Sequence, residues 1–555
     1  MSGTTTACAL LALTLPCIPA FAAASAVPSA ADTAARIDAA LAASYKPDAP
    51  GVTVIVVKDG RTVLRKAYGM ADIAHKVPLA PDTPMRLGSI TKQFTSTAIL
   101  MLVDEGKVKL DDDITVYLPG YPTHGKSITV EHLLTHTSGI ASYTGKPAYE
   151  KTMGKDLTVA QMIDSFKDDP LDFEPGTRYK YNNSGYFLLG AIVEKVSGMR
   201  YDEFVAQRIF VPLGMTRTAY EGHARSKAVQ AVGYSAGGGG FAPSAALSMT
   251  QPYAAGAIVS TVDDLARWDA AVSSGKLLKA ASWQRAFTPY TLASGKGTGY
   301  GYGWQVATMQ GVPMIGHGGG INGFNTFAVR LPSEHVYVAV LGNSDSGTMR
   351  AEDAAFRAAA IAIGKPFPDF KAVALPAAAL DAWSGVYRTG DGIQRTLRRE
   401  GERFVLQREG RPPVTLQAYA DNGFFIPGTL SWIELARGAD GKAITMTLHQ
   451  PDVDQVHART GDAPAPRKPV RLDHARYDAY VGRYQLAPQF VLAMTREGDR
   501  YYAQASGQPK LEIFALDERT FFSDAVGAEL RFDDAQPGQL VLRQGGRDTK
   551  GTKLP

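Results

Sequence analysis

The rhythm of apolar and polar residues changes along the chain and predicts different elements in different regions. Residues 52–57 form a continuous apolar, β-branched run, residues 58–60 carry turn chemistry, and residues 62–64 begin a second run, so a β-hairpin is expected. From residue 89 to residue 104, apolar side chains recur every three or four positions, which predicts a helix that Gly106 ends.

Helical and strand patterns continue up to about residue 365. Residues 160–166 and 185–196 have helical periodicity, whereas residues 325–330 and 336–340 are typical of strands. Strands at both sequence ends of this region, with helices between them, predict one mixed sheet that is joined from both ends.

The pattern after Gly364 is different, because helical periodicity fades and short aromatic strands dominate. Three motifs recur at one interval of 97 residues: 385–387 with 482–484, 401–404 with 498–501, and 424–425 with 521–522. A constant interval indicates two homologous all-β modules, which we expect to be small antiparallel barrels or sandwiches.

These patterns give the expected organisation of the chain. Stretches rich in proline near residues 366–376 and 463–469 are typical of linkers. The expected units are a first domain at 32–365, a linker at 366–378, a β module at 379–462, a linker at 463–470 and a second β module at 471–555.

The N-terminal segment has the features of an export signal. Residues 1–31 contain no charged side chain, residues 7–15 are apolar, and small-x-small cleavage sites lie within residues 20–24. This predicts a secretory signal peptide over residues 1–24, although its start lacks a lysine or arginine. Pro16 cuts the apolar run well short of the roughly 20 residues of a membrane-spanning helix. We therefore predict a periplasmic or secreted protein.

Composition narrows the classes of function. The 555 residues are 45% hydrophobic and 20% charged, which is ordinary for globular proteins and excludes disorder, collagen and a disulfide scaffold. The net charge of +4 is spread along the chain and does not favour a nucleic-acid partner. Both cysteines, Cys8 and Cys17, lie in the predicted signal peptide, so disulfides and cysteine-based metal sites are excluded from the rest. No later segment is long and apolar enough to span a membrane.

The first candidate for chemistry is Ser89 with Lys92, in an S-x-x-K motif at the start of the predicted helix. Residues three apart lie on one helix face, and a desolvated lysine amine can serve as the base that activates a serine hydroxyl. The spacing alone is weak, because Ser273 and Lys276 repeat it beside Gly275 at an apparent helix end.

Two further motifs have polar or glycine-rich character. Tyr181 and Asn183 form Y-x-N, in which a phenol near a lysine can relay a proton and an amide can bind a substrate amide; the alternative is a plain turn. His317 is followed by three glycines, which allow close approach of a substrate to free N–H groups; here the alternative is a glycine turn.

Together these motifs resemble the serine β-lactamase and D-alanyl-D-alanine carboxypeptidase superfamily, in its class C-like branch with esterases and D-aminopeptidases. S-x-x-K, Y-x-N and H-x-G occur in the order typical of that superfamily, and residues 130–139 and 302–304 are also typical of the branch. The resemblance covers roughly residues 35–365. It implies an α/β (α+β) β-lactamase-like transpeptidase fold, with an antiparallel sheet flanked by helices and a helical subdomain, followed here by the two all-β modules.

The resemblance also implies roles for the motif residues. Ser89 would attack a carbonyl and form an acyl-enzyme, while Lys92 and Tyr181 would share the proton transfers in a division left open. The N–H groups of Ser89 and Gly320 would bind the oxyanion, and Asn183 would orient the substrate amide. No metal and no cofactor is expected.

One position departs from the pattern. Classical members have lysine at the first position of the third motif, where this chain has His317, followed by Gly319 at the third position. Because histidine is normally neutral near pH 7, a fixed positive charge for a substrate carboxylate is missing. This favours aminopeptidase, amidase or esterase relatives, and the two β modules also resemble the layout of bacterial D-aminopeptidases.

The sequence thus predicts an exported serine hydrolase that acts on small amides, peptides or esters, among which D-amino-acid peptides and cell-wall peptides are candidates. The alternatives are a true β-lactamase or penicillin-binding carboxypeptidase and, from another class, a non-catalytic cell-wall-binding protein. The natural substrate, the oligomeric state and the role of the β modules stay open.

Three other patterns are expected to be coincidental. Ser235 lies in a G-x-S-x-G sequence, but the glycines at 237–240 follow it where a nucleophile elbow needs a helix. His132 and His136 lie four apart without a carboxylate in the H-E-x-x-H position, so we expect structural roles for both. We interpret residues 237–240 as a mobile loop near the cleft.

Overall fold

The computed structural model describes residues 29–554, apart from residues 223–229, 238, 348, 410, 440, 442, 465–466, 488–489, 507–509, 525 and 545–546. The side chains of residues 147 and 148 are also not described. The predicted signal peptide at 1–24 lies outside the described residues.

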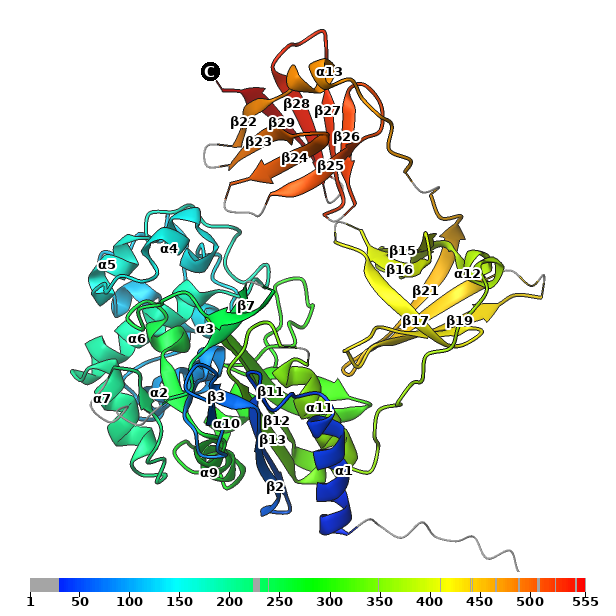
Figure 1. The fold of residues 1–555 in the computed structure, drawn as a ribbon. Coiled ribbons are helices and arrows are strands. Elements are labelled where there is room, and N and C mark those ends of the chain that lie inside the picture. The colour runs from blue at the N-terminus through cyan, green and yellow to red at the C-terminus, as the bar shows by residue number, and fades with distance from the viewer. Residues whose placement is uncertain are drawn as a thin grey trace, which may run out of the picture.

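A six-stranded sheet forms the centre of the first domain (Figure 1). Its strands, in spatial order, are β10 (Gln305–Met309), β11 (Val312–Ile321), β12 (Phe324–Leu331), β13 (Val336–Gly342), β1 (Val52–Lys58) and β2 (Arg61–Tyr68). The predicted hairpin is β1–β2, and β1 pairs with β13, so both sequence ends do join one sheet. All neighbouring strands in it are antiparallel. The expectation of a mixed sheet was wrong, because each connection returns the chain in the opposite direction.

Helices cover both faces of this sheet, and β1 shows why. Its side chains alternate: Val54 and Val56 enter one buried cluster, whereas Ile55 enters the other. The first cluster lies under α1 (Ala30–Ala42) and α11 (Ala351–Ala362). On the other face, α9 (Val262–Ser273) packs against β1 and β13.

A helical subdomain continues the second cluster (Figure 1). Its central helix, α2 (Thr91–Asp104), is buried from Thr91 to Leu102 and packs against α6 (Asn183–Ser197). The other helices of the first domain are α3 (Val130–Leu134), α4 (Pro147–Thr152), α5 (Val159–Asp164), α7 (Tyr201–Val205), α8 (Tyr253–Gly256) and α10 (Ala280–Ala286). Its short strands are β3 (Met70–Asp72), β4 (Val77–Pro78), β5 (Met85–Arg86), β6 (Ala219–Tyr220), β7 (Tyr234–Gly237), β8 (Gly240–Pro243) and β9 (Ile258–Ser260).

Two closed antiparallel barrels follow, as the repeated motifs indicated. The strands of the first barrel are β14 (Gly385–Arg388), β15 (Gln394–Glu400), β16 (Arg403–Arg408), β17 (Val414–Ala420), β18 (Gly423–Phe425), β19 (Trp432–Arg437), β20 (Ala443–His449) and β21 (Asp454–Gly461), preceded by α12 (Ala377–Trp383). Those of the second are β22 (Gly482–Ala487), β23 (Phe490–Glu497), β24 (Arg500–Ala505), β25 (Leu511–Ala515), β26 (Thr520–Ser523), β27 (Ala528–Phe532), β28 (Gln539–Gln544) and β29 (Arg547–Lys553), preceded by α13 (His474–Asp478).

The barrels repeat individual contacts as well as motifs. In the first barrel Arg399 forms a bidentate ion pair with Asp381, and in the second Arg496 does so with Asp478. Each pair links a strand to the helix that precedes the barrel, and the two pairs stand 97 residues apart in sequence. The repeat therefore preserves the attachment of the preceding helix to the barrel.

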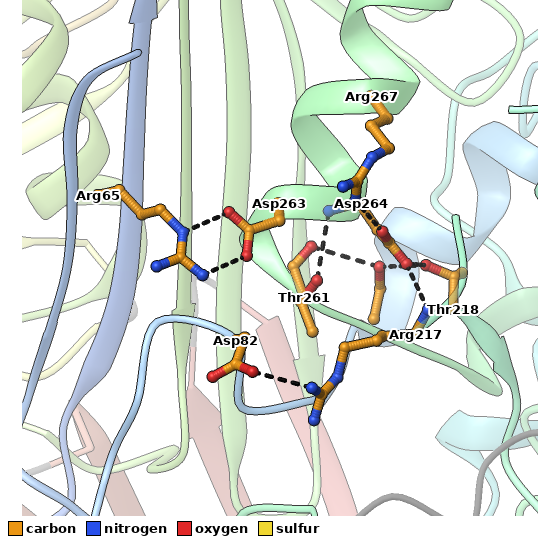
Figure 2. Close-up of polar contacts among 9 residues, drawn as sticks. Arg65, Asp82, Arg217, Thr218, Thr261, Asp263, Asp264 and Arg267 are labelled. Atoms are coloured by element: carbon orange, nitrogen blue, oxygen red, sulfur yellow. Dashed lines mark hydrogen bonds and ion pairs between the residues drawn. The ribbon is translucent and has the colours of Figure 1, made fainter. Parts of the chain in front are cut away.

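A buried carboxylate anchors the start of α9 (Figure 2). Asp264 is 1% exposed and accepts hydrogen bonds from the Arg217 N–H (2.8 Å), the Thr218 hydroxyl (2.8 Å) and the Arg267 guanidinium (2.6 Å). Its own N–H donates to the Thr261 hydroxyl, which caps the helix. The helix is thereby fixed to the segment before β6.

The carboxylate of the preceding residue, Asp263, forms an ion pair nearer the protein surface. Asp263 accepts a bidentate pair of hydrogen bonds from Arg65 of β2, at 2.6 and 2.7 Å, in a partly exposed position (Figure 2). Further along α9, the Trp268 indole N–H donates to the Gln93 side chain at 3.0 Å. Since Gln93 follows Lys92 on α2, α9 connects the sheet to the helix that carries the candidate site.

These adjacent carboxylates allow a matched test of stability. We expect Asp264→Ala to lower the free energy of unfolding by about 2–4 kcal/mol, because it leaves buried donors without a partner. The control Asp263→Ala removes a partly exposed ion pair and should cost about 0–1 kcal/mol. Urea unfolding followed by tryptophan fluorescence measures both, and equal losses would contradict the anchoring role of Asp264.

Candidate active site

Ser89 and Lys92 lie together where the sheet meets the helical subdomain. Ser89 is in a single 3₁₀ turn, η1 (Gly88–Ile90), and Lys92 is in the first turn of α2. The Lys92 Nζ atom lies 3.0 Å from the Ser89 Oγ atom. Lys92 is fully buried, and burial lowers its pKa well below the ordinary value, since a charged amine loses its hydration there.

The partners of Lys92 define how its protons are placed. Nζ donates to the Asn183 Oδ1 atom at 2.9 Å and to the Ala255 carbonyl at 2.9 Å, and both oxygens can only accept. A neutral amine has two N–H bonds and one lone pair. With both N–H bonds used in this way, the lone pair faces the Ser89 hydroxyl.

Asn183 is held in place by the start of α6. The preceding residue, Asn182, caps this helix, because its side chain accepts from the Gly185 N–H at 2.9 Å. The Asn183 Nδ2 atom donates to the Thr144 hydroxyl at 3.1 Å, which orients Oδ1 toward Lys92. The predicted Y-x-N segment is therefore a helix start, and a plain turn is excluded.

Tyr181 lies beside the lysine. The Lys92 Nζ atom is 4.8 Å from the centre of the Tyr181 ring. Although Tyr181 is 36% exposed overall, desolvation at its hydroxyl end raises its pKa, and a hydrogen bond with Ser89 offsets this only in part. The phenol thus keeps its proton at neutral pH, so it is a hydrogen-bond donor next to the serine.

Strand β11 brings the third motif against the serine. A Cβ atom on Gly319 would lie 2.0 Å from the Leu87 carbonyl oxygen, so only glycine allows this approach. The Thr326 hydroxyl of β12 also donates to that oxygen, at 2.8 Å. The strand pair is therefore docked two residues before Ser89.

Gly320 presents its N–H toward the serine side. It lies opposite Asn325, the next pair after the hydrogen-bonded pair that closes the hairpin, so its N–H points away from β12. On that side the pairing with β10 stops at Gln305, the first residue of β10, which lies opposite Gly316, so β10 does not reach Gly320. A Cβ atom on Gly88 would lie 3.1 Å from the Gly320 nitrogen, which places this N–H beside the backbone of Ser89.

His317 is buried in a neutral form. Its Nδ1 atom lies 2.6 Å from the Gly318 carbonyl oxygen, which can only accept, so Nδ1 carries the proton. Its Nε2 atom then accepts from the Tyr300 hydroxyl at 2.8 Å. Burial first, and the nearby Lys92 second, lower the pKa of His317 to about 3. The position where classical members have a cation is uncharged here.

His136 contacts the Y-x-N motif, although the spacing of His132 and His136 in the sequence suggested no such contact. Its Nδ1 atom accepts from the main-chain N–H of Asn182 at 3.1 Å, and its ring centre lies 4.3 Å from that of Tyr181. It is 1% exposed and has a positive φ of 59°. One buried imidazole thus contacts two consecutive residues of the motif, which sequence spacing could not reveal because 46 positions separate His136 from Asn182.

Gly303 provides the other close approach. A Cβ atom at this position would lie 2.7 Å from the Lys92 carbonyl oxygen and 2.8 Å from the Ser96 hydroxyl, and its φ is +80°. The glycine of residues 302–304 therefore lets that segment pack directly on α2.

The other patterns do not join the site. Ser235 lies in strand β7 and donates to Asp345 at 2.6 Å, with no helix after it. Gly237 ends β7 and Gly240 begins β8, and these two residues pair with each other; residue 238 of the predicted loop lies outside the described residues. His132 completes a capping box with Thr129 at the start of α3, a structural role. In the part of the chain that the structure describes, no cluster of three metal-ligating side chains occurs and no helix is long and apolar enough to cross a membrane.

The fold and these contacts define a class: a serine hydrolase whose nucleophile is paired with a buried lysine in S-x-x-K. A family model described as Beta-lactamase matches residues 34–363. Because this is more than half of the chain, the chain belongs to the Beta-lactamase family. The antiparallel sheet with its helical subdomain, followed by two all-β barrels, confirms the fold class that the sequence predicted.

Individual proteins are similar over most of the length. Penicillin-binding protein 4* of Bacillus subtilis (strain 168) is 28% identical over 438 residues, covering 74% of this chain and 94% of that protein. A D-aminopeptidase of Brucella anthropi is 26% identical over 509 residues, covering 90% of this chain and 92% of that protein. The octameric penicillin-binding protein homologue from Pyrococcus abyssi aligns with a TM-score of 0.55 and 26% identity, over 76% of this chain and 98% of that one.

The buried neutral His317 should make stability depend on acid. Its pKa is about 3 in the folded state and ordinarily near 6.5, so below pH 6.5 the unfolded chain binds a proton that the folded chain does not. The contribution of the neutral His317 to the free energy of unfolding is therefore fully present above pH 6.5 and is lost as the pH drops toward 3. Between pH 7 and pH 5 we expect His317→Gln to lose about 2 kcal/mol less than the parent protein.

Urea unfolding at the two pH values measures this difference. His124→Asn is the control, because this imidazole is exposed and its φ of +54° suits asparagine. The control should lose as much stability on acidification as the parent. The same acid loss in His317→Gln as in the parent would contradict a buried neutral imidazole.

The role of His136 can be separated into its two contacts. His136→Ala removes both the acceptor and the ring, and we expect kcat/KM to fall about tenfold to hundredfold through misplacement of Tyr181 and Asn183. His136→Asn keeps an acceptor where Nδ1 was and tolerates a positive φ, so it should recover part of the loss. Equal kcat/KM in the two variants would contradict positioning through the Asn182 hydrogen bond.

Proposed function

We propose that this serine hydrolase is exported and cleaves small amides or peptides of D-amino acids through an acyl-enzyme on Ser89. The similarity to the Brucella anthropi D-aminopeptidase over 90% of the chain supports the substrate class. The uncharged segment over residues 1–31 supports export to the periplasm or the medium. Peptides released from a cell wall are a candidate source of such substrates.

The contacts of Lys92 give the first step. Its lone pair takes the proton of the Ser89 hydroxyl, 3.0 Å away, while Oγ attacks the substrate carbonyl carbon. The N–H groups of Ser89 and Gly320 stabilise the oxyanion. The Asn183 amide faces the substrate amide while its oxygen keeps Lys92 in place.

The second step breaks the carbon–nitrogen bond. The leaving nitrogen needs a proton, which the Tyr181 phenol supplies from beside Ser89 and recovers from the Lys92 ammonium. Water then attacks the acyl carbonyl carbon and gives a proton to Lys92, and the Ser89 oxygen recovers that proton as its bond to the acyl group breaks. No group outside Ser89, Lys92 and Tyr181 has to ionise.

The single observation that carries the substrate assignment is the neutral, buried His317. It is held between Tyr300 and the Gly318 carbonyl and supplies no positive charge. A substrate carboxylate would enter this site without a cation to bind it, at a cost in desolvation. This disfavours a β-lactamase or a carboxypeptidase and favours amides without a carboxylate at that end. The proton network at Ser89 disfavours a non-catalytic cell-wall-binding protein.

A substrate panel tests the proposal. We expect D-aminoacyl p-nitroanilides to have the highest kcat/KM, with the L-enantiomers and a chromogenic cephalosporin at least about tenfold lower, a difference of about 1.4 kcal/mol in transition-state binding. Ser89→Ala should lose about a thousandfold or more in kcat. Ser273→Ala is the matched control, because that serine repeats the S-x-x-K spacing outside the site.

The outcomes separate the alternatives. Faster turnover of the cephalosporin than of every amide would overturn the amidase proposal in favour of a β-lactamase. Stable acylation of Ser89 by a penicillin, with no amide turnover, would favour a penicillin-binding protein. Full activity of Ser89→Ala would contradict the nucleophile.

A further inference from the structure

The second barrel is filled at one end only. Near α13, which lies over that end in Figure 1, aromatic rings stack closely: Tyr477 on Tyr501 with 4.0 Å between ring centres, and Tyr480 on Phe532 with 4.1 Å. Phe521 packs edge-on against Tyr477 at 5.3 Å. This end is a solid aromatic core.

The opposite end contains a cavity of about 50 Å³. A single water molecule needs only roughly 10–15 Å³ of such space. Most of the lining residues are apolar, and three of them are alanines; the lining includes Leu492, Ala503, Ala505, Ile513, Ala528 and Leu542. The polar side chains of the lining are Ser523 and Gln544, and the Gln544 amide already donates to the Val526 carbonyl. The cavity thus offers few partners to water.

The corresponding positions of the first barrel carry different side chains. At the interval of 97 residues, Leu492 corresponds to Arg395, Ala503 to Leu406, and Ala505 to Arg408. The registers agree, because Arg395 lies opposite Arg408 just as Leu492 lies opposite Ala505. Arg395 and Leu406 are buried in the first barrel and have smaller counterparts in the second, whereas Arg408 is exposed and does not fill the first barrel.

A polar pair completes the filling of the first barrel. The Arg395 guanidinium contacts the His457 Nε2 atom, and both residues are buried. In strand register Tyr387 pairs with Arg459 and Tyr484 with Lys553, so the residue that corresponds to His457, two positions earlier, is Gly551. The second barrel therefore has leucine and glycine where the first has arginine and histidine, and of these two only Leu492 lines the cavity, because Leu486 and Leu540 occupy the space beside Gly551.

We propose that this cavity in the second barrel is a binding site for a small apolar ligand that inserts a short alkyl group. Packed interiors rarely leave such space, because the lining atoms lose contacts on the empty side. An apolar cavity stays dry and gains those contacts from a hydrocarbon of matching size. The site lies in a hydrophobic cluster separate from the one that contains Ile90, next to Ser89.

The full-length protein labelled with ¹³C-methyl alanine provides the test, with 1-hexanol as the alkyl probe. We expect saturable shifts of the Ala503, Ala505 and Ala528 methyl signals. The buried methyl group of Ala443 in the first barrel should not move. No saturable shift with this probe, or an equal shift at Ala443, would overturn the proposal.

A filling variant adds a second measurement. Ala505→Leu places a larger side chain in the cavity, so it should abolish the shifts and raise the thermal midpoint of the free protein. Ala493→Leu on β23 is the matched control, since Ala493 lies between the inward residues Leu492 and Met494 and faces out. Binding retained in Ala505→Leu, or lost in Ala493→Leu, would show that the probe binds elsewhere. If Ala505→Leu does not fold, Ala528→Val replaces it.

Discussion

The first domain is organised around one desolvated amine. Lys92 has no contact with solvent, and its Nζ atom has two obligate acceptors and one hydroxyl as partners. A buried ammonium is costly, so burial favours the neutral amine, and the two acceptors then fix where its lone pair points. The acid–base chemistry proposed for Ser89 depends on this constraint, because the lone pair of the neutral amine is directed at the serine hydroxyl 3.0 Å away.

Distant parts of the chain cooperate to maintain that burial. Asn183 arrives on α6, Ala255 on α8, and Gly303 from the segment before β10 packs on the Lys92 backbone without a side chain. Gly319 docks β11 on Leu87 in the same manner. At both positions glycine lets the backbone of one segment contact another segment directly, where a side chain would hold the two apart. The neutral His317 continues this pattern, since burial also keeps its imidazole uncharged beside the neutral amine of Lys92.

Much of this could be predicted from the sequence, because it depends on local patterns. The β1–β2 hairpin, the helix after Ser89 and the 97-residue repeat each follow from periodicity or spacing, and the order of three short motifs indicated the site. The contribution of His136 could not be predicted, because its bond to Asn182 depends on how the segments before α4 and α6 pack. The antiparallel direction of the β1–β13 pair could not be predicted either, because these strands are far apart in sequence, whereas the other neighbours in the sheet are joined by short turns. The pairing of β7 with β8 involves glycines, which strands usually disfavour. The cavity of the second barrel emerges only when the two copies are compared side by side.

The titration of Lys92 itself tests the central claim most directly. NMR of ¹³Cε-lysine-labelled protein, with Lys92 assigned by its absence in Lys92→Arg, reports the pKa of this amine. We expect a pKa well below 10.5, retained in Ser89→Ala because the cause is burial rather than the serine. A Lys92 signal that titrates near 10.5 or above would show a charged lysine at neutral pH and would contradict its role as the base.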